Sequence, residues 1–500
     1  MKLKICFIAA LLCVLSTSHV FSEPIEITIK SAVLIALENN ESLKVERFQP
    51  QIYKTFEDGE QAAFDPVLTG KAGFSRELSQ RRQASSSSTS IESQDNFTEA
   101  GVGVSKFLST GTNVGVDVST NSTWSDLYND LSVPRIGFSV TQALLRGRGT
   151  GVNLASLHQA RLDTRISQFE LRGFVEALIC EVEKTYWDYA LALRNIQILK
   201  KSLKVAEQQL KETEELIGVG KLPETEITSA QAEIALQRQG LINVNSAMAK
   251  KRLRLLQLLN PPGANLWQRE VLLKYVPGVP RVMLDSVESH VEVALRFRPD
   301  LNEARLSIKR GDLEVVKTRN GLLPKLDLFL TLGKTGYADS FGSSVSNMTG
   351  DYYDFSVGIN VRYPFKNAAA RAGYKRSLLR LDQAAEAVNN LSNLVEMDVR
   401  TAYIEVNRTK EQISASKATR KLQKEQLRIE TEKFRVGRST MFLVAQAQRD
   451  FLESQISETQ AIANCLKALV ELYRLEGSLL ERRGIMAPGR EPARNLDEKQ

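Results

Sequence analysis

The segment 154–217 constrains this 500-residue chain most, because its pattern predicts one uninterrupted helix of unusual length. It contains no proline and a single glycine, Gly173. Its apolar residues advance by steps of three and four and then keep a seven-residue period, which is typical of a coiled-coil helix. At about 1.5 Å per residue, such a helix would span roughly 96 Å, too long for an ordinary globular core. The seam that we expect to face partner helices comprises Ile179, Val182, Tyr186, Tyr189, Leu193 and Ile196.

The same pattern occurs a second time further along the chain, at a fixed offset that takes Val182 to Val399 (399 − 182 = 217), and it includes the turn that ends the long helix. Repetition at a fixed spacing predicts two copies of one structural unit. Each turn carries a glycine, the residue that adopts the left-handed backbone of helix ends without penalty. The second seam comprises Val399, Tyr403, Val406 and Ile413. The two predicted turns are centred on Val219, Gly220 and Lys221 and on Val436, Gly437 and Arg438.

The segment 1–22 has the features of a secretory signal peptide, in which Lys2 and Lys4 precede an apolar run at 5–15. A buried amino-terminal helix is the alternative. Beyond this segment, no stretch approaches the roughly 18 to 20 apolar residues of a membrane-spanning helix, so insertion into a membrane would require strands. The formal charge of +7 is mild and dispersed, which argues against a nucleic acid partner.

Two regions change to a period of two, which predicts strands. We expect strands within 67–145 and a β-hairpin at 325–365 with a polar loop at 338–350. One face of these strands is apolar and the other is polar or small, which is typical of a transmembrane β-barrel. A soluble sandwich shares this alternation, but the signal peptide and the polar loops favour the barrel. Two hairpins would leave unpaired edges in lipid, so assembly of several copies is required.

The first strand region is longer than the second. The offset between the repeats falls from 258 at Pro66 and Pro324 to 221 at Ile136 and Val357, which leaves 37 additional residues (258 − 221) in the first region. The segment 96–121 has the pattern of an additional hairpin. The sequence leaves open whether this hairpin joins the barrel.

The expected fold class is an α+β membrane protein with two internal repeats, each a β-hairpin region joined to a long helical hairpin. A helix at 27–49 opens the first repeat and recurs at the offset of 258. The carboxy-terminal tail is polar and contains two prolines, so we expect it to be disordered. The expected organisation is a signal peptide at 1–22, repeat 1 at 23–260 with a helical hairpin at 151–260 and its turn near 218–223, a linker at 261–284, repeat 2 at 285–484 with a helical hairpin at 368–484 and its turn near 436–440, and a tail at 485–500.

No motif indicates an enzyme, a metal site or a cofactor. The glycine-rich segment 146–151 lacks the third glycine of a dinucleotide-binding loop, so we interpret it as a joint between strand and helix. His158 and His290 have no partner at the spacing of metal ligands. Cys180 and Cys465 are expected to be small buried apolar residues.

The order of these features resembles the outer-membrane efflux proteins of the TolC family, from about Ile27 to Leu480. The resemblance implies a homotrimer whose protomers contribute strands to one shared β-barrel and helices to one long periplasmic coiled-coil barrel, with the two seams in the tunnel wall. The motifs that carry it are the two turns, the pairs Ala230-Gln231 and Ala447-Gln448, and the strand-to-helix passage at 140–147.

In function, the resemblance implies a passive exit duct in the outer membrane, surrounded by lipid and extending into the periplasm. The duct would belong to a tripartite efflux or type I secretion system and would dock onto a periplasmic adaptor protein and an inner-membrane pump of the RND or ABC type. Some members carry two aspartates beyond the second turn, where this chain has Leu443 and Gln446, which places an acid ring at the aperture in doubt. A periplasmic adaptor and a secreted coiled-coil scaffold are the alternative functions.

The turns are the candidate docking site at the periplasmic tips. Lys221 and Arg438 directly follow the turn glycines and would project from the tips, where an adaptor meets them. The alternative is that the glycines only cap helices and the cations only complement the helix dipole.

Overall fold

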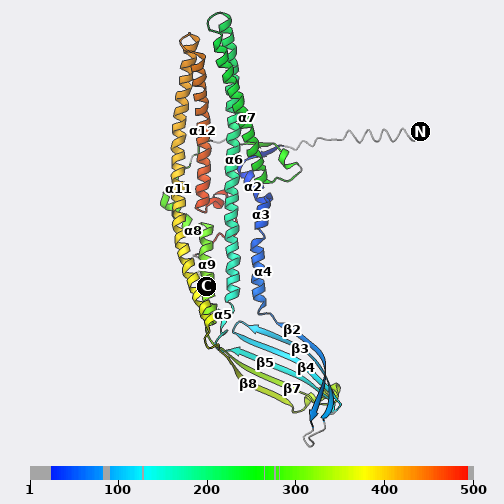
Figure 1. Ribbon diagram of the computed structural model, residues 1–500. Helices are drawn as coiled ribbons and strands as arrows, with labels where there is room; N and C mark the ends of the chain where they lie inside the picture. Colours follow the sequence, from blue (N-terminus) through cyan, green and yellow to red (C-terminus); the bar gives the residue numbers. More distant parts are fainter. Residues whose placement is uncertain are drawn as a thin grey trace, which may run out of the picture. The chain divides into compact units, whose positions relative to one another are not determined.

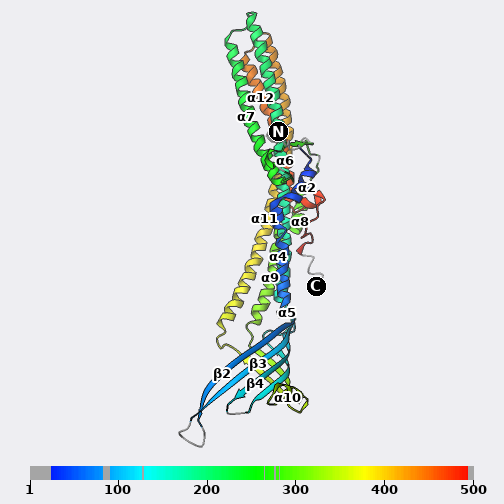
Figure 2. The same ribbon diagram turned by 90° about the vertical axis from the view of Figure 1, so that its right-hand side faces the viewer.

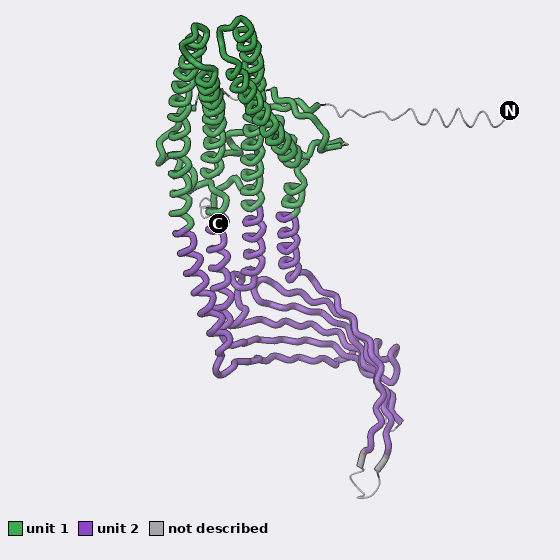
Figure 3. The backbone as a smooth tube through the Cα atoms, turned by 45° about the horizontal axis from the view of Figure 1, so that its top comes forward, with its two compact units in different colours: residues 1–48, 169–301, 391–500 green, residues 49–168, 302–390 purple. Residues whose placement is uncertain are grey.

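The computed structural model describes residues 24–82, 90–126, 129–263, 265–274, 278–280 and 282–493. The predicted signal peptide and residues 494–500 of the predicted tail lie outside these residues. The chain divides into two compact units, which Figure 3 shows in different colours. Unit 1 comprises residues 1–48, 169–301 and 391–500, and unit 2 comprises residues 49–168 and 302–390.

Four helices form two helical hairpins. They are α6 (Ala155–Gly218), α7 (Thr225–Leu259), α11 (Ala368–Arg435) and α12 (Met441–Leu475). The first helix of each hairpin has 64 or 68 residues, and each returning helix has 35. The heptad pattern predicted at 154–217 corresponds to α6. Within unit 1, α7 and α12 contact each other, and Figure 2 shows them side by side.

Short elements complete unit 1. Strand β1 (Ile25–Ile27) pairs in parallel with β6 (Val271–Leu273), and helix α2 (Ile29–Asn39) packs against α7. The prediction of one helix at 27–49 is therefore wrong, because Ile27 belongs to a strand. The predicted linker at 261–284 also contains structure, since it supplies β6.

Asn40 divides the remainder of the predicted opening helix. Its backbone is extended, with φ −63° and ψ 121°, and its side chain accepts a hydrogen bond from the Leu43 amide at 3.0 Å. Asparagine is a preferred amino-terminal helix cap, so α2 ends here and a new helix starts. The two helices that follow are α3 (Glu41–Glu46) and α4 (Gln49–Ala62), the latter in unit 2.

The beginning of the predicted disordered tail is packed. Helix α13 (Leu479–Arg483) ends at Gly484, which has φ +68°, and Ile485 and Ala487 then pack against the core of unit 1. The prediction of disorder is wrong for these two residues, because their apolar side chains find a place against buried helices.

Unit 2 contains one six-stranded sheet, which Figure 1 shows in the order β2-β3-β4-β5-β7-β8. All neighbouring strands are antiparallel. A short helix, α10 (Phe341–Ser346), occupies part of the segment predicted as a polar loop. The strands are β2 (Val67–Arg82), β3 (Ser90–Leu108), β4 (Thr112–Ser125), β5 (Leu131–Ala143), β7 (Lys325–Thr335) and β8 (Tyr353–Arg362).

The additional hairpin of the first repeat belongs to this sheet. The segment predicted at 96–121 corresponds to β3 and β4, which lie between β2 and β5. Further helices precede or follow the strands in the chain. They are α5 (Thr150–Asn153), α8 (Val287–Phe297) in unit 1 and α9 (Pro299–Asn320), most of which lies in unit 2.

Candidate functional site

The two predicted turns have the same backbone structure. Gly220 and Gly437 both have φ +74°, the left-handed conformation that glycine favours. The Gly220 amide donates to the Ile217 carbonyl at 2.8 Å and the Lys221 amide to the Leu216 carbonyl at 2.9 Å, and the second turn repeats this pair of bonds. This arrangement is a Schellman motif, which satisfies the last carbonyls of a helix.

The side chains of both turns are open to solvent in the protomer. Val219 and Val436 are each 69% exposed, and Lys221 and Arg438 are also exposed. An exposed valine next to an exposed cation offers an apolar and a charged contact together. The turns therefore combine a helix cap with a surface that a partner can reach.

Below the turns, α7 is joined to α12 by polar contacts. The Glu226 carboxylate accepts a hydrogen bond from the Met441 amide, the first residue of α12, at 3.0 Å. Further along, Arg449 forms a 2.8 Å ion pair with Glu233, whose side chain is only 1% exposed. Negative charge is favourable at a helix amino terminus. The carboxylate of Glu226 on α7 therefore stabilises the start of α12 and links the two hairpins. Leu443, in contrast, is exposed.

Most of the predicted seam residues belong to the core of unit 1. Ile179, Val182 and Tyr186 of α6 and Val399 and Val406 of α11 are all 0% exposed and belong to one apolar cluster. Burial of side chains this size is worth roughly 1.5 to 3 kcal/mol each. The two seams therefore hold α6 and α11 within the protomer, and their role in a tunnel wall stays a prediction.

The remaining seam residues are less uniformly placed. Tyr189 belongs to the same cluster and donates a hydrogen bond to the Val271 carbonyl at 3.0 Å. Leu193 and Tyr403 are partly buried against the cluster. Ile196 is also buried, whereas Ile413 lies in a separate small cluster.

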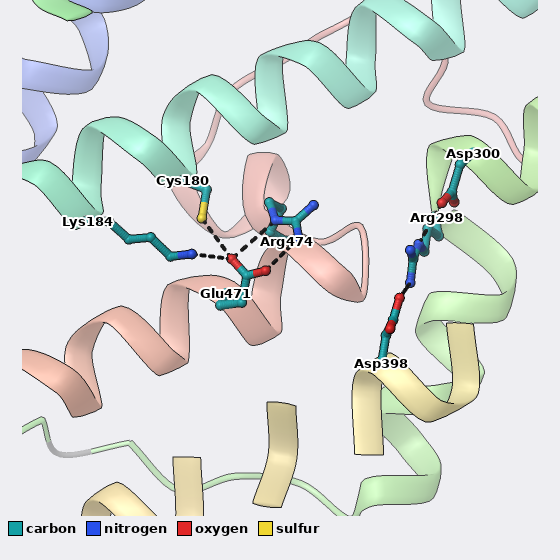
Figure 4. A network of polar contacts seen from close by, with 7 residues as sticks. All are labelled: Cys180, Lys184, Arg298, Asp300, Asp398, Glu471 and Arg474. Carbon is teal, nitrogen blue, oxygen red and sulfur yellow. Dashed lines mark hydrogen bonds and ion pairs between the residues drawn. The ribbon is translucent and has the colours of Figure 1, made fainter. Parts of the chain in front are cut away.

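A polar cluster around Glu471 joins α6 to α12 (Figure 4). Lys184 and Arg474 each form a 2.5 Å ion pair with its carboxylate, and the Cys180 thiol donates to it at 3.2 Å. Burial alone would raise the pKa of Glu471, but the hydrogen bonds and charges of Arg474 and Lys184 outweigh it and lower the pKa to about 2. Burial, reinforced by the charge of Glu471, raises the pKa of Cys180 to about 12, so the thiol stays protonated and unreactive.

A second set of ion pairs, also drawn in Figure 4, connects the junction between α8 and α9 to α11. Arg298 contacts Asp300 at 3.0 Å and Asp398 at 2.9 Å. The arginine side chain is 14% exposed, so both carboxylates compensate a largely desolvated charge.

One buried pair on α6 is imperfectly compensated. Arg172 and Glu176 are 2% and 3% exposed and lie 3.3 Å apart, and Arg172 also contacts Glu481 at 2.6 Å. Burial raises the pKa of Glu176 to about 8, against the opposing charge of Arg172. The titration of Glu176 therefore makes the folding stability of unit 1 depend on pH.

The sheet of unit 2 has one apolar and one polar face. Two neighbouring cross-strand rows, each with one residue from all six strands, show the difference. Because strand side chains alternate between faces, the two rows point to opposite sides. The apolar row is Leu68, Val104, Val116, Phe138, Leu332 and Phe355, and the polar row is Thr69, Gly103, Asp117, Gly137, Gly333 and Asp354.

The apolar face is uncovered in the protomer. Every member of its row is between 39% and 70% exposed. An apolar surface of this extent marks contact with another molecule or a membrane. None of the described helices is long and apolar enough to cross a membrane. Among the described residues there is also no group of three or more His, Cys, Asp or Glu side chains arranged to hold a metal ion.

A family model described as outer membrane efflux protein matches residues 113–261 and 291–478, more than half of the chain. The chain belongs to the outer membrane efflux protein family. Both matched segments include a helical hairpin with its turn, so the match covers the two tips described above. The function of this efflux protein is accordingly that of an outer-membrane channel, and the alternatives of a periplasmic adaptor and a secreted scaffold are not supported.

Relatives of this efflux protein are distant in sequence and similar in fold. Outer membrane protein TolC of Vibrio cholerae serotype O1 is 21% identical over 329 residues, which cover 65% of this chain and 73% of that protein. Outer membrane efflux protein BepC of Brucella suis biovar 1 is 21% identical over 348 residues, 69% of this chain and 72% of that protein. The solved structure of CusC is 15% identical and covers 91% of this chain and 93% of its own, with a TM-score of 0.67.

Sequence patterns missed the polar contacts that join the helices of this efflux protein. Glu226 and Met441 are 215 residues apart, and no periodic signal connects them. Arg172 and Glu176 have the spacing of an ordinary exposed helical ion pair, so their burial is not visible in the sequence. The one available signal was their position among the buried seam residues of α6.

Proposed function

We propose that this efflux protein is a passive exit duct in which three copies share one β-barrel and surround one periplasmic helical tunnel. The observation that carries the proposal is the six-stranded sheet of unit 2, with its apolar face exposed and its two edge strands, β2 and β8, each paired on one side only among the described strands. An open sheet edge is not stable in the hydrocarbon region, where every backbone polar group must be paired within the protein.

Direction along the chain supports closure between copies. Six antiparallel strands place β2 and β8 in opposite directions. If β8 of one protomer lies beside β2 of the next, that pair is again antiparallel, so identical copies continue the sheet without a break. A closed ring of identical subunits satisfies both edges through one repeated contact.

Partners of the proposed duct meet it at the periplasmic tips. We propose that a periplasmic adaptor contacts the turns at Val219, Gly220 and Lys221 and at Val436, Gly437 and Arg438, and that an inner-membrane pump of the RND or ABC type drives export through it. The exposure of both valines and both cations supports this assignment. Outer-membrane lipid covers the apolar face of the sheet.

Mass measurement in mild detergent tests the assembly. We expect three copies per particle and ion conduction after reconstitution into planar bilayers. Conducting particles that contain a single copy would overturn the proposed trimer.

Two neighbouring residues of the edge strand test which face meets lipid. Val357 lies on the apolar face of β8 and Ser356 on the polar face. We expect Val357→Glu to reduce the amount of trimer in the outer membrane strongly, because a charge in contact with lipid is costly. The matched variant Ser356→Glu should assemble like the wild type. Equal assembly of both variants would contradict the assignment of the faces.

A further inference from the structure

The two strand regions of the chain differ in their number of strands, with four in the first and two in the second. At the offset of 258, Val67 at the start of β2 corresponds to Lys325 at the start of β7. At the offset of 221, Ile136 in β5 corresponds to Val357 in β8. Strands β3 and β4 therefore have no counterpart in the second repeat. They are an insertion of one hairpin, and we refer to them as the inserted hairpin.

The inserted hairpin is part of the continuous sheet. Strand β3 pairs with β2 from Val67↔Ser105 to Arg82↔Ser90, which is the whole length of β2. Strand β4 pairs with β5 from Thr112↔Gln142 to Thr123↔Leu131. No pairing joins β2 directly to β5 among the described strands. Removing the inserted hairpin from the sheet would thus break the connection between the first strand and all the others.

The apolar face continues across the inserted hairpin. Val102 and Val104 of β3 and Val116 and Val118 of β4 are between 47% and 57% exposed and lie on this face. Val116 is aligned with Phe138 of β5. A one-residue shift in register would turn all these valines to the other face. The inserted hairpin is therefore matched to the same surroundings as the strands that flank it.

The polar face also continues across it, through an independent contact. The Arg135 side chain of β5 binds Asp354 of β8 through two hydrogen bonds, at 3.0 and 2.7 Å, and lies 3.4 Å from Asp117 of β4. Space for this arrangement comes from glycines: a Cβ at Gly137 would lie 2.3 Å from an Arg135 nitrogen, and a Cβ at Gly333 would lie 2.6 Å from another. The guanidinium thus ties the inserted hairpin to the carboxy-terminal edge strand.

We propose that the inserted hairpin is a structural part of the membrane barrel, so that three copies close an eighteen-stranded barrel (3 × 6) rather than a twelve-stranded one (3 × 4). The proposal rests on the trimeric duct described above. Barrel diameter grows roughly linearly with strand number, so the barrel is about 1.5 times as wide as the second repeat's plan alone would give, and barrels of about 16 to 18 strands leave an aqueous channel. The specific consequence is a membrane section that admits bulkier hydrated cargo than a twelve-stranded barrel.

Electron cryomicroscopy of the wild-type protein in lipid nanodiscs tests the strand number directly. We expect a threefold-symmetric particle with eighteen strands around the membrane section. A trimer with twelve strands, in which β3 and β4 lie outside the barrel, would overturn this inference and leave the proposed duct intact. Particles without threefold symmetry would overturn the proposed duct itself.

A matched deletion measures the width. Removing the segment 90–126 takes out the excess of the first strand region (126 − 90 + 1 = 37, equal to 258 − 221) and gives both repeats the same plan. Spin labels at Val357→Cys, with Cys180 and Cys465 replaced by alanine, report the distance between equivalent positions of the three copies. We expect this distance to be about 1.5 times larger with the inserted hairpin than without it.

The control is a label at Val219→Cys in the exposed turn, where the deletion should leave the distance between copies unchanged. Equal Val357→Cys distances with and without the inserted hairpin would overturn the inference. If the deletion variant does not assemble, the number of strands counted in the wild-type barrel by electron cryomicroscopy still tests the inference.

Discussion

In the first half of the chain, the two helices of the helical hairpin have 64 and 35 residues, and in the second half they have 68 and 35. The strands of the two halves differ far more, since the first half supplies four strands of the sheet and the second half supplies two. The helices of both halves pack against each other, so their lengths are coupled. The number of strands in one half does not depend on the number in the other. One added hairpin leaves the direction of the remaining strands and the alternation of their faces unchanged.

The largest expected effect is the loss of assembly when a seam residue is replaced by a charge, and it tests whether equivalent positions of the two seams contribute equally to stability. Val182 and Val399 are related by the sequence offset of 217 and are both 0% exposed in the same cluster. We expect Val182→Asp and Val399→Asp to abolish the folded trimer alike, because each buries a charge without a partner. Trimer yield in mild detergent measures this. The milder variants Val182→Ala and Val399→Ala should still assemble, with lowered melting temperatures. Normal assembly of either aspartate variant would show that the two seams are not equivalent.

A loss of function without a loss of assembly is expected at the tips. Lys221→Glu with Arg438→Glu reverses one exposed charge in each turn and leaves both glycine caps in place. We expect a normal trimer that no longer crosslinks to its adaptor or supports export. The two single variants divide the effect between the repeats, and similar partial losses would indicate that both turns contact the adaptor. Wild-type export by the double variant would show that the adaptor docks at a different site.

Glu176 is a point where the halves differ chemically, since Asn393 occupies the equivalent position of the second repeat (176 + 217 = 393). The pKa of Glu176 is raised from 4.5 to about 8, so the folded protein holds this proton over a range in which the unfolded chain releases it. Stability from this group is fully present below pH 4.5 and is lost as the pH rises through 8.

We therefore expect Glu176→Gln to match the wild type below pH 4.5 and to exceed its thermal stability above pH 8. Glu471→Gln is the control with the opposite sign. Because the pKa of Glu471 is lowered from 4.5 to about 2, its carboxylate contributes stability above pH 4.5 that is lost as the pH falls toward 2, so this variant should be less stable than the wild type at pH 7. A pH-independent difference between Glu176→Gln and the wild type would contradict the assignment.

The sequence predicted those parts of the fold that are encoded locally. Heptad spacing located α6 within one residue at each end, 154–217 against Ala155–Gly218, and the turn glycines marked both tips. The β1–β6 pairing was missed, because two very short strands on either side of the first helical hairpin have no periodicity that connects them. Alternation predicted the strands of the inserted hairpin, but its place between β2 and β5 depends on pairings that no local pattern specifies. The Glu226 contact to α12 is of the same kind.

The smallest expected effect compares the two turn glycines. Gly220 and Gly437 share φ +74°, and a Cβ at either position would meet nothing within 4 Å. Replacement by alanine therefore changes only the backbone energy, and we expect Gly220→Ala and Gly437→Ala to lower tip stability by about 1 kcal/mol each. Amide hydrogen exchange in the last turn of α6 and of α11 measures this local effect.

Gly218 supplies the matched control, just before the turn that contains Gly220. It also has nothing within 4 Å of an added Cβ, but it ends α6 without a positive φ, and the second repeat has Arg435 at the equivalent position. Alanine favours helix over glycine by up to about 1 kcal/mol, so Gly218→Ala should slow exchange in the same turn that Gly220→Ala accelerates. Equal acceleration of amide exchange by both substitutions would mean that the tip has no room for a side chain at either glycine. The left-handed conformation shared by Gly220 and Gly437 would then not explain why the two turns are alike.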